Sequence, residues 1–220
     1  MGEPVLIIGE SGSGKTYSIK NLDPEKVGIL LCEKSRLPFR KPFKTYKVRN
    51  IIRTDENNNT QVVRQSAVIQ SVLAQATRKI YVVDDSQYIM ANEFFDRAGE
   101  NGYQKFTDIG RGFRDVVHMV NDELPDDVIV YFLHHTELDQ TTGKQKAKTI
   151  GRMLDEKLTL EGCFNIVLHA RTDGHEYWFS TQSDGTDTAK SPEEMFPAKI
   201  PNDLALVDKT IREYYGMEAV

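Results

Sequence analysis

The sequence has only two cysteines, Cys32 and Cys163, and both lie within apolar runs. Two cysteines are too few for a disulfide scaffold or a zinc site, so the composition favours a reducing compartment such as the cytoplasm. The chain also lacks any apolar stretch near the roughly 20 residues that a membrane span needs. Its start, Met1-Gly2-Glu3-Pro4, has no basic lead of the kind found in signal peptides. We therefore expect a cytoplasmic protein with no membrane partner.

An excess of positive charge is likewise missing, because the formal net charge is −5. This excludes a uniformly basic coat for nucleic acid and leaves room for a local basic groove. With 220 residues, 39% of them hydrophobic, the chain has the size of one domain with a substantial core. No repeat and no Pro/Gly/Ser-rich linker divides it. We expect a single domain over residues 1–220, in which 191–220 form a C-terminal extension with an amphipathic helix.

Apolar runs alternate with helical patterns along the chain, which favours an α/β fold with a mostly parallel sheet and helices on both faces. Two late strands flank Asp173-Gly174 and predict a C-terminal β-hairpin. An exposed loop is expected over 55–60, and an Asn202-Asp203 cap before the last helix. The expected strands are 4–9, 27–32, 45–53 (an edge strand), 79–83, 128–133, 163–170 and 175–181, and the expected helices are 15–22, 61–76, 106–120 and 204–214.

The segment Gly9-Glu-Ser-Gly-Ser-Gly-Lys-Thr16 matches the pattern G-x-x-x-x-G-K-[ST] at every fixed position. Glycines let successive backbone N–H groups form a nest for phosphate oxygens, and the helix that follows presents its positive end to them. Lys15 is expected to reach the β- and γ-phosphates, and the Thr16 hydroxyl to bind Mg²⁺. The predicted nucleotide contacts are Gly9, Glu10, Ser11, Gly12, Ser13, Gly14, Lys15, Thr16 and Tyr17.

Two adjacent carboxylates follow the strand Ile80–Val83, where a P-loop NTPase needs an acidic group near its metal ion. Asp84 is the metal candidate because it directly follows the apolar run. Hydrolysis also needs a group that orients or deprotonates the attacking water. Asp85 is one candidate, and Glu33, at the carboxyl end of the second strand, is the favoured one because its side chain reaches further.

The fourth strand ends in His134-His135, and a polar group there can contact the γ-phosphate or the water. Alternate residues of a strand face opposite sides, so only one of the two histidines is expected in the site, and we name His135 as the catalytic candidate.

Two stretches offer basic side chains for nucleic acid. Lys144, Lys146 and Lys148 alternate, so in an extended loop they share one side and can follow a phosphate backbone, or they belong to a solvated loop. A second stretch has Phe39, Phe43 and Tyr46 among basic residues between 40 and 47. Its aromatic rings either stack on bases or fix a loop to the core.

Four features follow one another over most of residues 3–200. They are the cradle 9–16, the strand that ends in Cys32-Glu33-Lys34, the segment Val82-Val-Asp-Asp-Ser86, and the stretch 148–157 before the strand 164–168. The first is specific to P-loop NTPases, and the others gain weight from their order. Together they resemble the RecA-like ATPase core, and in particular the small phage ATP-binding proteins associated with single-strand-annealing recombination.

The resemblance implies ATP hydrolysis with Mg²⁺, coupled to assembly on single-stranded DNA as a homo-oligomeric ring or filament, with an annealing or single-strand-binding protein as a possible partner. It also implies that the catalytic glutamate corresponds to Glu33, that the polar sensor lies in the His134-His135 pair, and that a mobile DNA-binding loop spans 136–148. A cation that reaches the neighbouring subunit's nucleotide corresponds to Lys190 or, second, Arg171.

Two other functions remain open on the residues alone. One is a regulatory or assembly module that binds the nucleotide and barely turns it over, because the acid after Asp84 is an aspartate. The other is a small-molecule kinase. Such enzymes usually have an arginine-rich lid after a later strand, and Gly151-Arg152 offers only one arginine for it.

Overall fold

The computed structural model describes residues 1–33, 36–155 and 157–220. Lys34, at the end of the second motif above, and Glu156, within the fourth, lie outside the described residues. No helix in these ranges has the length and apolar content that a bilayer crossing requires.

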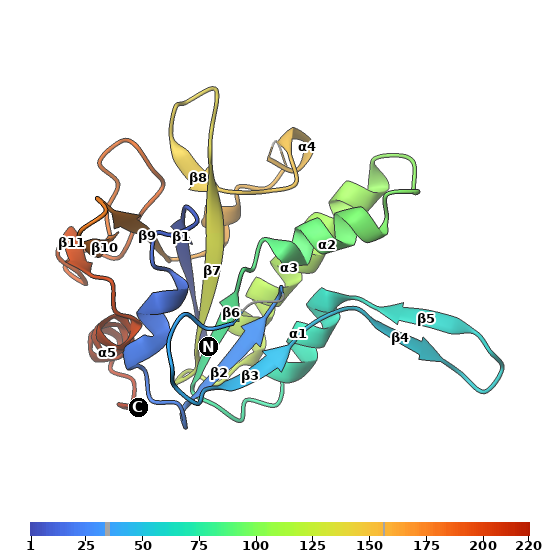
Figure 1. Ribbon diagram of the computed structural model, residues 1–220, viewed down its shortest axis with the longest axis horizontal. Helices are drawn as coiled ribbons and strands as arrows, with labels where there is room; N and C mark the ends of the chain where they lie inside the picture. Colours follow the sequence, from blue (N-terminus) through green and yellow to red (C-terminus); the bar gives the residue numbers. More distant parts are fainter. Residues whose placement is uncertain (34–35, 156) are drawn as a thin grey trace.

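A nine-stranded sheet forms the centre of the molecule (Figure 1). Its strands are β1 (Glu3–Gly9), β2 (Val27–Leu31), β3 (Lys44–Lys47), β6 (Ile80–Asp84), β7 (Ile129–Leu138), β8 (Gln145–Ala147), β9 (Ile166–Thr172), β10 (Tyr177–Ser180) and β11 (Lys199–Pro201). The order β3-β2-β6-β7-β1-β9 is parallel throughout, and β10 and β11 extend it in antiparallel fashion. Strand β7 therefore separates β1, which leads into the cradle, from β6, which ends in Asp84. This is the expected architecture, a mostly parallel α/β sheet with an antiparallel C-terminal hairpin.

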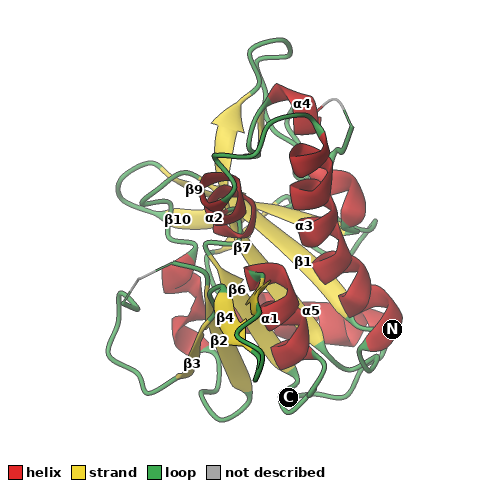
Figure 2. Ribbon diagram, turned by 90° about the vertical axis from the view of Figure 1, so that its right-hand side faces the viewer, coloured by secondary structure: helices red, strands yellow, loops and turns green. Residues whose placement is uncertain are grey.

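Helices cover both faces of the sheet (Figures 1 and 2). One face carries α1 (Gln65–Leu73), α2 (Tyr88–Asp96) and α3 (Gln104–Glu123), and the other carries η1 (Thr16–Asn21) and α5 (Leu204–Tyr215). Two short helices, α4 (Arg152–Asp155) and η2 (Leu160–Cys163), follow β8. Side chains alternate along β1, so Leu6 and Ile8 enter the core under α3, and Val5 and Ile7 enter the core under α5. Burial on both faces explains why β1 is apolar throughout.

The expected helix 15–22 is a single 3₁₀ segment, η1. It ends because Leu22 is extended ahead of Asp23-Pro24, as a residue near proline prefers. A helix of six residues adds little dipole, so the backbone of the loop and Lys15 must supply most of the attraction for anions.

The expected edge strand 45–53 is wrong in its second half. Strand β3 ends at Lys47, and the chain then forms β4 (Ile51–Thr54), which pairs with β5 (Thr60–Val63) in a hairpin that extends away from the body (Figure 1). The Asp55 carboxylate accepts hydrogen bonds from the backbone N–H groups of Asn57 and Asn59, and this Asx turn reverses the chain. The polar loop was expected, and β5 takes the first residues of the expected helix 61–76.

The loop conformation expected for 136–148 is also wrong, because these residues form a β-hairpin, while their mobility and contact with DNA stay predictions. Strand β7 continues to Leu138, and β8 pairs back on it. The Asp139 carboxylate accepts hydrogen bonds from the backbone N–H groups of Thr141 and Thr142, which fixes the turn.

The C-terminal predictions hold more closely. Strands β9 and β10 form the expected hairpin, with Gly174 at φ +92° in its turn. The Asp203 side chain caps α5 by accepting from the Ala205 N–H. Residues 191–220, expected as an extension, give β11 to the sheet and α5 to the second core.

Candidate functional site

The cradle lies between β1 and η1, at the carboxyl edge of the parallel strands. Gly12 and Gly14 have φ of +84° and +88°, a conformation in which side chains are strained. A Cβ on Gly14 would also lie 2.9 Å from the ring of Tyr177, a residue of β10. Two glycines thus let the loop turn tightly while an aromatic ring packs over it.

Lys15 is buried, and its ammonium group folds back over the cradle. The Nζ atom donates hydrogen bonds to the backbone oxygens of Gly9 (2.7 Å) and Glu10 (2.8 Å). Burial lowers the pKa of Lys15 to about 8, an effect that the nearby Asp85, Asp84 and Glu10 partly oppose. The side chain is therefore mostly protonated at neutral pH and lies where a phosphate oxygen can replace the two carbonyls.

Thr16 and Asp84 form a pair at the centre of this edge. The Thr16 Oγ1 donates to Asp84 Oδ1 at 3.0 Å, and Asp84 is only 2% exposed. Burial and, after it, the charge of the adjacent Asp85 raise the pKa of Asp84 to about 6, against the hydrogen bond from Thr16 and the charge of Lys15, which lower it. A hydroxyl and a buried carboxylate are oxygen ligands of the kind that Mg²⁺ takes, and a cation would restore the charge of Asp84. The pair fits a magnesium ion that keeps its remaining ligands from phosphate and water.

Asp85 and His135 form a second pair. The His135 Nε2 lies 3.4 Å from Asp85 Oδ1, and both side chains are about a quarter exposed. Asp85 adopts φ +58°, which is uncommon for a residue other than glycine and costs on the order of 1 kcal/mol. The carboxylate is therefore held at the cavity by a strained backbone.

His134 has a different role from its neighbour, as the alternation of the strand predicts. It is fully buried, with Nε2 2.7 Å from the Lys148 oxygen and Nδ1 2.8 Å from Ser86 Oγ. Burial lowers the pKa of His134 to about 4, so the ring is neutral at pH 7. A carbonyl only accepts, so Nε2 donates to Lys148, and Nδ1 accepts from Ser86. His134 fastens β8 to the core.

Lys15, Thr16, Asp85 and His135 line one cavity of about 670 Å³, and Asp84 is linked to it through its hydrogen bond with Thr16. Sequence reasoning named Asp85, His135 and the cradle residues, but it missed Pro38 and Tyr177. No signal near the cradle identifies Tyr177, because the sheet brings β10 to it from more than 160 residues away. The lining residues are Ser11, Gly12, Gly14, Lys15, Thr16, Tyr17, Pro38, Asp85, His135 and Tyr177.

Glu33, the favoured catalytic carboxylate, is not among the lining residues. It lies beyond the end of β2 and forms an ion pair with Arg49, whose Nη2 is 3.1 Å from Glu33 Oε1. Its charge still contributes to the rise of the pKa of the buried Cys32, after burial itself and the charges of Asp84 and Asp85. Glu33 therefore belongs to the same edge of the sheet, outside the cavity wall.

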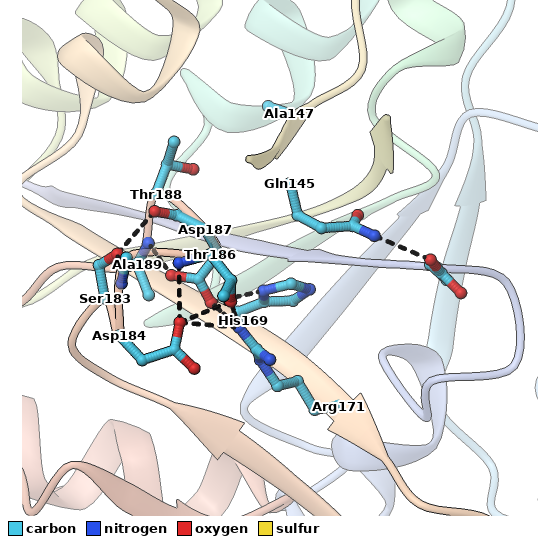
Figure 3. A network of polar contacts seen from close by, with 12 residues as sticks. Gln145, Ala147, His169, Arg171, Ser183, Asp184, Thr186, Asp187, Thr188 and Ala189 are labelled. Carbon is cyan, nitrogen blue, oxygen red and sulfur yellow. Dashed lines mark hydrogen bonds and ion pairs between the residues drawn. The ribbon is translucent and has the colours of Figure 1, made fainter. Parts of the chain in front are cut away.

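The two candidate trans-acting cations lie in different settings. The Arg171 guanidinium contacts Asp187 and donates to Thr186 Oγ1 at 3.0 Å, within a network that also holds His169 against Asp187 at 2.7 Å (Figure 3). Burial alone would raise the pKa of Asp187, but the hydrogen bonds from His169 and Arg171 hold it well below its usual range. The Lys190 backbone pairs with Val167, and its side chain is exposed. The Arg171 guanidinium is thus engaged within the chain, whereas the Lys190 side chain has no ion-pair partner among the described residues.

The three lysines of the β7–β8 hairpin are also unequal. Lys146 forms ion pairs with Asp155 at 2.8 Å and Glu137 at 3.6 Å. Lys144 and Lys148 are exposed. The hairpin contacts the cradle through Gln145, whose Nε2 donates to Glu10 Oε1 at 3.0 Å (Figure 3).

One of the comparisons with known proteins identifies the family of the chain. No curated protein matches the sequence. A KaiC-like protein from the hyperthermophilic archaeon Pyrococcus horikoshii OT3 is 12% identical in structural alignment, which covers 81% of this chain and 78% of that chain with a TM-score of 0.40. The AAA domain family matches residues 2–141, which include the cradle, Asp84, Asp85 and His135. The chain therefore belongs to the AAA domain family of P-loop ATPases.

Proposed function

We propose that this chain binds ATP with Mg²⁺ at the carboxyl edge of its sheet and hydrolyses it. The observation that carries the proposal is that Lys15, Thr16 and the Asp85–His135 pair line one cavity, while the buried Asp84 accepts a hydrogen bond from Thr16 behind its wall. Its volume, about 670 Å³, is in the range of small-molecule sites. Adenine as the base rests on the family resemblance.

Each group of the cradle has a distinct task in this proposal. The backbone N–H groups of the loop and Lys15 bind the phosphates, and Lys15 exchanges its two carbonyl contacts for phosphate oxygens. Thr16 and Asp84 hold Mg²⁺, which supplies charge neutralisation on the phosphate oxygens.

Asp85 is the group that we propose to orient the attacking water and accept its proton. Its carboxylate lines the cavity, and His135, 3.4 Å away, can stabilise the charge or share the proton. Glu33 remains the alternative on the family resemblance. A domain movement would have to release it from Arg49 before it could face the water.

We further propose that hydrolysis is coupled to single-stranded DNA in phage recombination, annealing or replication, in a ring or filament of identical subunits. An annealing or single-strand-binding protein is the expected partner. These statements rest on the resemblance of the four ordered motifs. For the trans-acting cation, the exposed side chain of Lys190 supports it over Arg171, which is engaged with Asp187.

Steady-state ATP hydrolysis, measured with and without single-stranded DNA at low and physiological salt, tests the proposal. A rate that DNA raises, with the rise reduced by salt, supports a DNA-coupled ATPase. Tight nucleotide binding without turnover would replace it by a regulatory switch. Transfer of the γ-phosphate to a small acceptor would replace it by a kinase.

A further inference from the structure

The stretch from residue 34 to the end of β4 has an unusual charge. Residues 34–54 contain eight lysines and arginines and no acidic residue, in a chain whose net charge is −5. The rest of the chain is therefore strongly acidic. The stretch covers the loop after β2, the edge strand β3 and the first strand of the projecting hairpin (Figure 1).

Most of the cationic side chains that the structure describes in this stretch form no hydrogen bond or ion pair, although Lys44 lies against the ring of Tyr46. Lys41 donates to the backbone oxygens of Lys20 and Leu22, and Arg49 pairs with Glu33. Five others are exposed, and within the described residues none of them has an acidic partner, so they form what we call the basic edge. Its members are Arg36, Arg40, Lys44, Lys47 and Arg53.

The aromatic residues of the stretch serve the core. Phe43 is buried, and its ring contacts Phe39 edge-on at 5.7 Å. Phe39 in turn contacts Tyr17 at 6.2 Å. Tyr46 is half-buried, with the Lys44 ammonium 5.7 Å from its ring. The rings fix the loop, so the surface that remains outside is cationic and has no platform for stacking bases.

The geometry of the basic edge suits a linear polyanion. Strand β3 ends the sheet, so its outer side is open. Lys44 and Lys47 are three residues apart and point to opposite faces of the strand, on either side of that open border. A phosphate backbone that runs along the border meets cations on both sides. A globular acidic protein would need a concentrated patch. A bilayer would need apolar anchors beside the charges, and the large exposed apolar residues of the stretch, Ile51 and Ile52, lie on the projecting hairpin and not on β3 or the loop before it.

We propose that the basic edge is the surface on which this protein binds single-stranded nucleic acid, through phosphates alone. The inference rests on the proposed function, whose partner it locates. It assigns the contact to β3 and its flanking loop instead of the β7–β8 hairpin, where Glu137 and Asp155 neutralise Lys146. The edge also adjoins the nucleotide cavity, because Pro38 lines it and Phe39 packs on Tyr17.

A pair of charge-matched variants tests this surface. Lys44→Glu/Lys47→Glu reverses two charges of the basic edge, and Lys144→Glu/Lys148→Glu reverses two charges of the hairpin with the same change in net charge. The probe is a fluorescent oligothymidylate of about 30 nucleotides, long enough for several binding sites. Its binding is followed by anisotropy from about 50 to 200 mM salt.

The edge variant is expected to lose at least tenfold in affinity at the lower salt, and the slope of log K against log salt to fall by about 1.4, or about 0.7 per phosphate contact. The affinity of the hairpin variant should stay within about twofold of wild type, since Lys144 and Lys148 lie outside the basic edge. Oligodeoxyadenylate should bind as tightly as oligothymidylate, because no ring is available to read bases.

Several results would overturn the assignment. They are no binding by the wild-type chain, a larger loss in the hairpin variant, a tenfold preference for one base, or retention by acidic vesicles in place of the oligonucleotide. Circular dichroism and nucleotide binding check that each variant is folded. DNA binding needs no turnover, so wild-type protein that binds DNA without hydrolysing ATP would refute the proposed function and leave this surface intact.

Discussion

Buried charged groups lie at both ends of the parallel strands, but Arg212 and Asp208 at the amino end form an ion pair, whereas Lys15 and Asp84 at the carboxyl end have no ion-pair partner among the described residues. At the carboxyl end, the Lys15 ammonium contacts only backbone carbonyls, and Asp84 is buried beside a second acid, so the pKa values of both groups are displaced. At the amino end, Arg212 donates to Asp208 at 2.7 Å and to the backbone oxygens of Asp127 and Lys79, and Tyr131 donates to Asp208.

The difference separates a site from a structural network. Groups at the amino end have their partners within the chain, so a ligand has nothing to add. At the carboxyl end, a phosphate would give Lys15 an anionic partner, and a metal cation would give Asp84 a cationic one. Both groups would therefore be stabilised by a bound ligand. Substitutions at the two ends should therefore fail in different ways.

The largest effect is expected from Lys15→Ala. ATP hydrolysis should fall by about 10³-fold or more, because the variant loses the cation that meets the phosphates. Its melting temperature should not fall, since the buried ammonium has no acidic hydrogen-bond partner to leave behind. Lys26→Ala, at the exposed amino end of β2, is the matched control and should hydrolyse ATP at the wild-type rate. A wild-type rate in Lys15→Ala would contradict the assignment of the cradle.

Arg212→Ala should produce the opposite pattern. Removal of the guanidinium leaves the buried Asp208 without its ion-pair partner, with only the hydrogen bond from Tyr131, which costs about 3–5 kcal/mol of unfolding free energy. Lys209→Ala, on the same helix, removes an exposed pair with Glu213 and should cost less than about 1 kcal/mol. Urea denaturation measures both. Folded Arg212→Ala protein should keep its rate per molecule, and a selective loss of turnover would break the distinction between the two ends.

The next effect distinguishes Asp85 from Glu33 as the carboxylate that activates the attacking water. Asp85→Asn should lower turnover by about 10²-fold and keep nucleotide binding, because asparagine tolerates the left-handed backbone and loses only the basic oxygen. Glu33→Gln should change the rate by less than about threefold, as a residue outside the cavity wall. Single-turnover hydrolysis and nucleotide titration separate the two effects. The reverse result would restore Glu33 as the catalytic glutamate.

The sequence predicted most of the carboxyl end, because the cradle motif and the strand ends are local patterns. Gly9–Thr16, Asp84 and the buried strands β1, β2, β6 and β7 are all encoded within a few residues. The alternation of strand residues also separated His135 from His134.

The features that the sequence did not predict depend on contacts between residues that are far apart in the chain. Tyr177 reaches the cavity only because β10 joins the sheet. The ion pair between Glu33 and Arg49 exists because β3 runs beside β2. The hairpins β4–β5 and β7–β8 form because Asp55 and Asp139 cap their turns, a signal that resembles any polar loop.

The smallest effect is expected at Glu3. Unlike Arg212 and Asp208, this group at the amino end is buried without an ion-pair partner in the described part of the chain. Burial raises the pKa of Glu3 to about 7, a hydrogen bond from Asn165 only partly opposes this, and its Oε1 has no partner. Between about pH 4.5 and 7 the folded chain therefore holds a proton that the unfolded chain releases, so wild-type stability should fall as the pH rises through this window. Glu3→Gln keeps the acceptor for Asn165 and removes the titration. It should gain on the order of 1 kcal/mol at pH 8 and nothing near pH 4, measured by urea denaturation, while ATP hydrolysis stays unchanged. A gain that does not vary with pH would mean that Glu3 is already satisfied, and the two ends would then differ without exception.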